Sequence, residues 1–174
     1  MTGAELLIDA FGRVPEMVHG AVDGLTAEEL TARLDPNANS IAWLVWHMSR
    51  IEDDHVAEVA GTPQVWTSDG WATRWRLPFD DSDTGYGHTA KEVAAVTGDR
   101  GMLLGYFDAV HAMAVEYMRG LTDADLDRVV DENWDPPVTL GVRMVSVAGH
   151  NFEQMAQADF IRGVLERKRR RSGT

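Results

Sequence analysis

Two histidines more than a hundred residues apart occupy similar positions on two predicted amphipathic helices. His47 lies beside the apolar stripe of a helix predicted over residues 41–60, which follows the favoured N-cap residue Ser40. His150 lies beside the apolar stripe of the last predicted helix, and Gln154 follows it by one turn. Side chains at this spacing emerge about 5–6 Å apart, so both could hold one ion. With His47 as a ligand from the other helix, the three residues predict an open metal site.

The third residue of this set is an unusual metal ligand. A neutral amide oxygen brings no charge and suits hard cations better than zinc, which His, Cys and carboxylates usually bind. Asp54 falls on the same side of its helix as His47, so its carboxylate could accept the ring N–H and fix the tautomer. Two interpretations follow. His47, His150, Gln154 and water hold a divalent ion (Zn, Ni or Fe), or the site has lost its metal.

The composition limits the kind of protein and its partners. A chain of 174 residues fits one domain, residues 1–174, with a sizeable core. A net charge of -12 disfavours nucleic acid as a partner, because a polyanion would be repelled. The sequence has no run of 18 apolar residues and no basic-then-apolar start, so we expect no membrane association and a cytoplasmic location. Without any cysteine, a thiol nucleophile would have to come from a substrate.

Hydrophobic periodicity predicts four long helices and several short ones. The short helices begin at two capping boxes, Thr26 with Glu29 and Thr89 with Glu92. Four amphipathic helices with intervening connections predict an all-α four-helix bundle. The basic residues at the end, 166–174, are expected to form a frayed tail whose cations complement the helix dipole. The long helices are predicted over residues 3–23, 41–60, 99–121 and from 140 into this tail.

The connection from Thr62 to His88 is the least regular part of the chain. A connection of this length in a compact domain is usually functional or carries short elements of its own. Its three tryptophans either line a substrate pocket or anchor the connection on the core, and anchoring is the commoner role. The side chains considered for a pocket are Trp43, Trp66, Trp71, Trp75 and Gln157.

Two stretches of the sequence, WLVWHMSRIEDDH and GHNFEQMAQADFIRG, resemble the DinB-like family. This family includes mycothiol-dependent maleylpyruvate isomerases and the mycothiol and bacillithiol S-transferases, built on a four-helix bundle. The resemblance spans nearly the whole chain. It implies that His47 corresponds to one metal ligand and that His150 and Gln154 correspond to the paired ligands of the last helix. The family usually has His where Gln154 stands, and often a carboxylate or His where His150 stands.

The resemblance implies a metal-dependent enzyme that uses a low-molecular-weight thiol. The expected reaction is S-transfer or isomerisation of a small-molecule substrate, with mycothiol as the co-substrate. A metal-dependent hydrolase is an alternative. The rival class is a metal-free bundle that forms a homodimer or holds a small ligand, and Gln154 favours it. The remaining histidines, His19, His55, His88 and His111, belong to no motif and are interpreted as structural.

Overall fold

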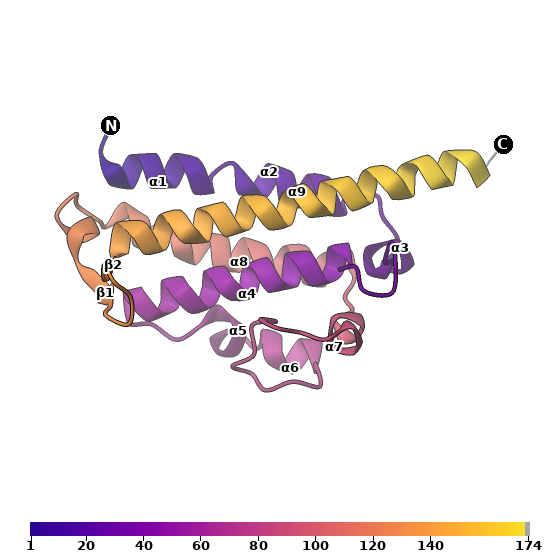
Figure 1. Cartoon of the computed structure of the whole chain (residues 1–174), viewed down its shortest axis with the longest axis horizontal. Helices are drawn as coiled ribbons and strands as arrows, with labels where there is room; N and C mark the ends of the chain where they lie inside the picture. Colours follow the sequence, from indigo (N-terminus) through magenta and orange to yellow (C-terminus); the bar gives the residue numbers. More distant parts are fainter. Residues whose placement is uncertain (173–174) are drawn as a thin grey trace.

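Four helical layers lie side by side along the long axis of the molecule in the computed structural model, which describes residues 1–172 (Figure 1). One layer is shared by two short helices, and the other three are single long helices. α4 packs against both α8 and α9, while α1 and α2 pack against α8 and α9. The predicted all-α four-helix bundle is confirmed. Its helices are α1 (Gly3–Phe11), α2 (Val14–Val22), α4 (Ile41–Ala60), α8 (Arg100–Arg119) and α9 (Leu140–Ser172).

The first layer differs from the single helix predicted over residues 3–23. The helix stops at Phe11 and restarts at Val14, with Pro15 in the first turn of α2. Proline has no N–H to donate to the carbonyl of the residue four places earlier, and its ring crowds that carbonyl. The chain therefore forms two short helices here.

The predicted capping boxes are present at the starts of two short helices. In each one the threonine hydroxyl accepts a backbone N–H, and the glutamate three residues later accepts the N–H of the threonine. The long connection after α4 also contains short helices, so it is less irregular than its composition indicated. The short elements are α3 (Ala27–Thr31), α5 (Val65–Ser68), α6 (Trp71–Trp75), α7 (Ala90–Ala95) and the 3-10 turn η1 (Asp125–Asp127).

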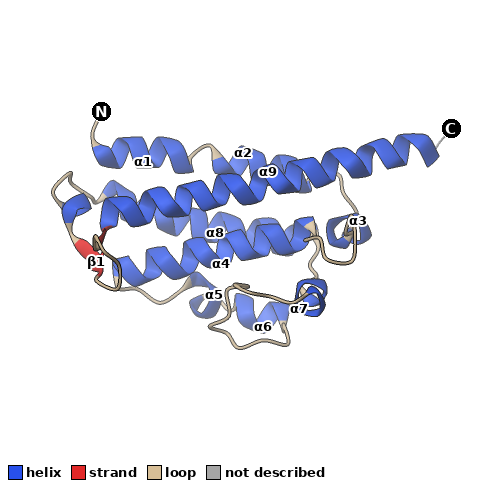
Figure 2. Ribbon diagram, viewed as in Figure 1, coloured by secondary structure: helices blue, strands red, loops and turns tan. Residues whose placement is uncertain are grey.

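A small hairpin closes one end of the bundle and leads into α9 (Figure 2). Strands β1 (Val129–Asp131) and β2 (Val138–Thr139) pair antiparallel, and residues 132–137 connect them. The backbone N–H of Leu140 bonds to the Arg128 carbonyl at 2.8 Å, so α9 begins directly from the hairpin.

Tryptophans of the long connection take part in the core. Trp66 and Trp75 are almost completely buried and pack edge-to-face on Trp46 of α4. The connection is therefore held against α4 by apolar burial.

Among the described residues, no helix combines the length and the apolar composition needed to cross a membrane.

The end of α9 is helical rather than frayed. The helix continues through the basic residues to Ser172 and extends beyond the neighbouring helices (Figure 1). The Arg169 guanidinium contacts the Glu29 carboxylate of α3, which ties this segment to the bundle. The rest of the expected tail, residues 173–174, lies outside the described residues.

Candidate metal centre

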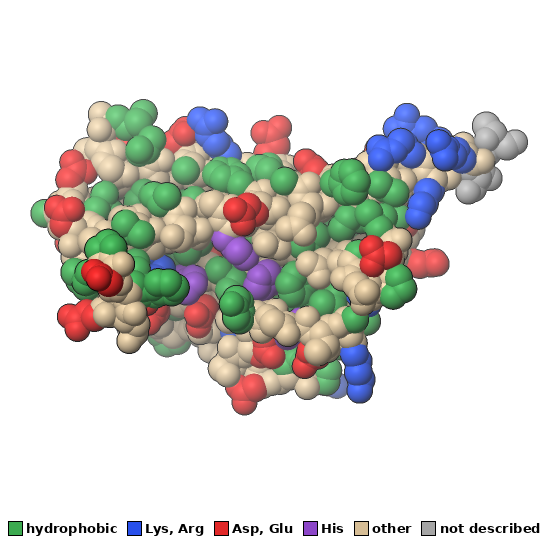
Figure 3. Space-filling view, in the orientation of Figure 1, with side chains coloured by type: hydrophobic (Ala, Val, Ile, Leu, Met, Phe, Trp, Pro, Cys, Tyr) green, Lys and Arg blue, Asp and Glu red, His purple; other side chains and the backbone are tan. Residues whose placement is uncertain are grey.

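The two histidines singled out by the sequence meet between α4 and α9. The Nε2 atoms of His47 and His150 lie 3.1 Å apart. Their rings approach edge to face, with centroids 4.9 Å apart. Histidine side chains are visible at the surface of the molecule (Figure 3), and both His47 and His150 line a cavity.

The environment of His47 determines which of its nitrogens is free. Its Nδ1 lies 2.6 Å from the Thr84 carbonyl oxygen. A carbonyl oxygen only accepts, so Nδ1 carries the hydrogen and the neutral ring has its lone pair on Nε2. Trp43 stacks on the same ring at 4.5 Å and an interplanar angle of 19°. His47 therefore presents an unprotonated Nε2 to His150, which supplies the hydrogen between the two rings.

Both imidazoles are neutral at neutral pH. Burial lowers the pKa of His47. Burial also lowers the pKa of His150 to about 4, with smaller contributions from the neighbouring His47 and His55. Neutral imidazole is the form that binds metals, so protons do not compete strongly at this site near pH 7.

A cavity of about 530 Å³ opens beside the histidine pair. Most of its wall is apolar, and the hairpin forms one side. Asp131 and Arg143 provide its charged groups, while His47, His55 and His150 face it from the two helices. The other lining residues are Ile51, Tyr86, Trp134, Val138, Val142, Ser146 and Val147.

His55 is the site residue that sequence analysis missed. Its Nδ1 accepts a hydrogen bond from Arg143 Nη1 at 3.0 Å, which leaves the ring hydrogen on Nε2. Burial lowers the pKa of His55, and the Arg143 charge adds to this effect. His55 follows His47 by two helical turns, and its place on the same face of α4 was the available signal.

Gln154 lies near the pair in sequence but not on the cavity wall. Its Oε1 is buried and has no hydrogen-bond partner among the described residues, as is also true of His150 Nδ1. Within residues 1–172, no three His, Asp or Glu side chains form a group able to hold a metal ion. The protein ligands that the structure brings together at this point are thus the two imidazoles of His47 and His150.

The structure places the other predicted site residues elsewhere. The Asp54 carboxylate accepts from Gln64 Nε2 at 2.7 Å, while the Thr84 carbonyl takes the position on His47 expected for Asp54. Asp54 follows His47 by seven residues. It therefore lies two turns further along α4, too far to reach the His47 ring. Of the expected pocket residues, Trp43 contacts a site histidine, His47.

The remaining expected pocket residues serve other contacts. Trp66 and Trp75 are core residues. Trp71 packs on Tyr106 and under the Arg74 guanidinium. Gln157 lines a separate cavity with Phe160.

Comparison with known proteins identifies the family. The family model of the DinB superfamily matches residues 10–158. The chain belongs to the DinB superfamily. A crystal structure described as the conserved protein of a locus from Enterococcus faecalis is similar to this DinB-superfamily chain at 28% sequence identity. The match has a TM-score of 0.87 and covers 93% of this chain and 96% of that one. No curated protein matches the chain.

Proposed function

We propose that this DinB-superfamily protein is a metal-dependent enzyme that joins or isomerises small molecules with a low-molecular-weight thiol such as mycothiol. The observation that carries the proposal is the pair of neutral imidazoles whose Nε2 atoms lie 3.1 Å apart beside a cavity. The chain contains no cysteine, so the thiol would be a co-substrate.

The donor set fits a divalent transition metal. Metal–nitrogen bonds of about 2.0–2.1 Å at roughly tetrahedral or octahedral angles put two ligand nitrogens about 3 Å apart. Imidazole nitrogen suits Zn, Ni and Fe, and His47 and His150 would hold the ion. The buried, unpartnered Oε1 of Gln154 would supply a weak third ligand, with water or thiol completing the coordination.

Each part of the site has a separate task in this proposal. A bound divalent ion would lower the pKa of a thiol toward neutrality and so supply the nucleophile. The Thr84 carbonyl and the stacked Trp43 ring keep His47 oriented. The apolar cavity wall binds the body of the electrophile and excludes water. His55, whose hydrogen is on Nε2, offers a hydrogen-bond donor to charge that develops on the electrophile.

A metal-free binding protein is the second candidate. The direct hydrogen bond from His150 to His47 satisfies both Nε2 atoms without an ion. The amide at position 154 also brings no charge to attract one. In this alternative the cavity beside the pair holds a small apolar ligand, or the bundle forms a homodimer.

Metal analysis of protein purified without an affinity tag separates the two candidates. Elemental analysis should find stoichiometric Zn, Ni or Fe, and zinc titration of stripped protein should give one site. His47→Ala should abolish this binding. His19→Ala is the matched control, because His19 is bound to Asp108 and lies away from the cavity. No metal in the purified protein and no zinc binding after stripping would favour the metal-free candidate.

A thiol-consumption assay tests the reaction. If the reaction is S-transfer, metal-loaded protein should consume mycothiol in the presence of an apolar electrophile, measured as loss of free thiol. If it is isomerisation, product should form only when mycothiol is present, with no loss of free thiol. Product formation that needs metal but no thiol would instead indicate a hydrolase.

A further inference from the structure

A short backbone segment of the long connection contacts His47 directly. Thr84 contributes its carbonyl, and Gly85 lies directly against the ring. A Cβ atom added at Gly85 would come within 2.9 Å of His47 Nδ1 and 2.9 Å of the Trp46 ring. Gly85 also has a φ of 92°, a conformation that L side chains rarely adopt. Both features require glycine at this position.

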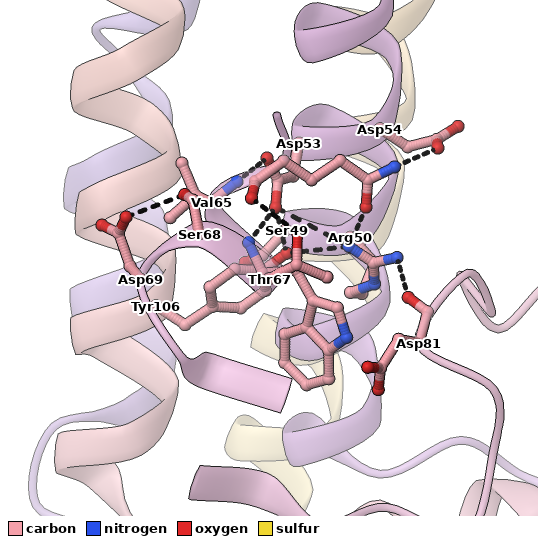
Figure 4. Close-up of polar contacts among 12 residues, drawn as sticks. Ser49, Arg50, Asp53, Asp54, Val65, Thr67, Ser68, Asp69, Asp81 and Tyr106 are labelled. Carbon is pink, nitrogen blue, oxygen red and sulfur yellow. Dashed lines mark hydrogen bonds and ion pairs between the residues drawn. The ribbon is translucent and has the colours of Figure 1, made fainter. Parts of the chain in front are cut away.

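Arg50 holds this segment, residues 81–85, which we call the strap. The Arg50 side chain is fully buried, and Arg50 follows His47 by one turn of α4. Nε donates to the Asp83 carbonyl at 3.1 Å, and Nη2 donates to the Asp81 carbonyl at 3.0 Å. In Figure 4 the guanidinium points at the backbone oxygen of Asp81. The buried Arg50 guanidinium thus donates hydrogen bonds to two backbone carbonyls of the strap.

The charge of this guanidinium is balanced from its own helix. Asp53 lies 3.7 Å from Arg50 and is also fully buried. Its carboxylate accepts from the backbone N–H groups of Val65 and Trp66 and from the Tyr106 hydroxyl. The same pair of residues therefore fixes both α5 and the strap on α4.

His88 also holds the strap. Its Nε2 lies 3.1 Å from Asp83 Oδ1, and the same oxygen accepts from the Gly85 N–H at 2.7 Å. Its Nδ1 accepts from Trp43 Nε1 at 3.1 Å. Trp43 is the ring stacked on His47, so His88 connects the strap to the second group that orients that histidine.

We infer that the strap is a positioning device for the candidate metal centre, with Gly85, Arg50 and His88 as its positioning residues. By keeping the Thr84 carbonyl on Nδ1, it holds His47 in the tautomer whose Nε2 is free to bind. A backbone carbonyl cannot protonate near neutral pH, whereas a carboxylate in this position would add charge. The inference deepens the proposed function and rests on it for its role in metal binding.

Two glycine substitutions provide a matched test. Gly85 and Gly87 both have positive φ, 92° and 74°, so alanine strains the backbone at either position. Only at Gly85 would the new Cβ meet His47, since a Cβ at Gly87 meets nothing within 4 Å. Nitrogen NMR of the imidazoles in metal-free protein reads the His47 tautomer, and calorimetric titration with zinc reads the affinity.

Gly85→Ala should move the hydrogen of His47 away from a pure Nδ1–H form and weaken zinc binding about 10- to 100-fold, the usual effect of losing a partner behind a metal ligand. Gly87→Ala should leave both readouts unchanged. An unaltered His47 spectrum in Gly85→Ala, or equal effects of the two substitutions, would overturn the inference.

His88→Phe provides the test if Gly85→Ala does not fold. It keeps an aromatic ring against Trp46 but removes the bonds to Asp83 and Trp43, so a mixture of His47 tautomers is expected. A pure Nδ1–H spectrum in this variant would refute the role of the strap. If wild-type protein binds no zinc, the proposed function fails, while the NMR comparison still decides whether the strap sets the tautomer.

Discussion

Two polar clusters include α4 residues one helical turn apart, and they differ in how many of their polar atoms have a hydrogen-bond partner. Arg50, Asp53 and Tyr106 are fully buried, and none of their side-chain polar atoms lacks a partner within the described residues. At the histidine pair, His150 Nδ1 and Gln154 Oε1 are buried without one. An unsatisfied buried polar atom costs about 1–3 kcal/mol. The contrast indicates that the first cluster stabilises the fold, and it supports the proposal that the second takes a ligand.

The largest effect is expected at the Arg50–Asp53 pair. Asp53→Ala leaves a buried guanidinium without its counter-charge and frees two N–H groups of α5, so it should lower the free energy of unfolding by about 3–5 kcal/mol. Urea denaturation measures this. The control is Asp9→Ala, which breaks an exposed ion pair to Arg13 and should cost less than about 1 kcal/mol. Similar losses in both variants would contradict the structural role of the cluster.

The second effect concerns the altered ligand. Gln154→His should complete a three-imidazole site, so zinc should bind more tightly than to wild type. At a zinc concentration 100-fold above its dissociation constant, the ion should stabilise the folded state by about 2.7 kcal/mol. Adding His150→Ala should remove this gain. Equal zinc affinities of wild type and Gln154→His would show that position 154 does not face the site.

A smaller effect is expected from pH in the metal-free protein. His150 has a pKa of about 4 when folded and 6.5 as the ordinary value. Between these values the unfolded chain binds more protons, so stability falls as pH falls through this window. From pH 7 to pH 5 the loss from His150 should be about 1 kcal/mol, allowing for solvent screening of a partly exposed ring. Urea denaturation at both pH values should show that the free energy of unfolding falls less in His150→Gln than in wild type. Equal decreases in the two proteins would contradict a lowered pKa of His150.

The smallest effect is expected at Asp54. Its carboxylate bonds to Gln64 and not to His47, so Asp54→Asn should change stability by no more than about 0.5 kcal/mol and leave zinc affinity unchanged. A tenfold loss of zinc affinity in this variant would restore the role that the sequence indicated for Asp54.

The features predicted from the sequence are those that local rules determine. Ser40 and Thr89 mark helix starts because a cap needs only the next three residues, and helical periodicity predicts the long amphipathic helices. The break before Pro15 could also have been read from the missing N–H. The strands of the hairpin are too short to show an alternating pattern.

The candidate site was predictable only in part, for a similar reason. His47 and His150 follow from the faces of their helices. The partner of His47 is a backbone carbonyl 37 residues away, and a carbonyl has no residue type by which to recognise it. The role of Arg50 was equally difficult to predict. A charged residue in an amphipathic helix normally indicates solvent exposure, whereas this one is buried among loop carbonyls.

The 3.1 Å contact between the two Nε2 atoms also determines where a hydrogen must go. His47 keeps its hydrogen on Nδ1, so the one hydrogen between the rings belongs to His150. Any cation that takes this place must displace that hydrogen to His150 Nδ1, an atom that points at no acceptor in the described residues. One turn further along α9, the Gln154 Oε1 is a buried acceptor that receives no hydrogen. Binding of a cation by both Nε2 atoms would therefore be a tautomer exchange in His150, and the displaced hydrogen would reach Gln154 Oε1 only after a side-chain movement, because the two atoms form no hydrogen bond in the structure.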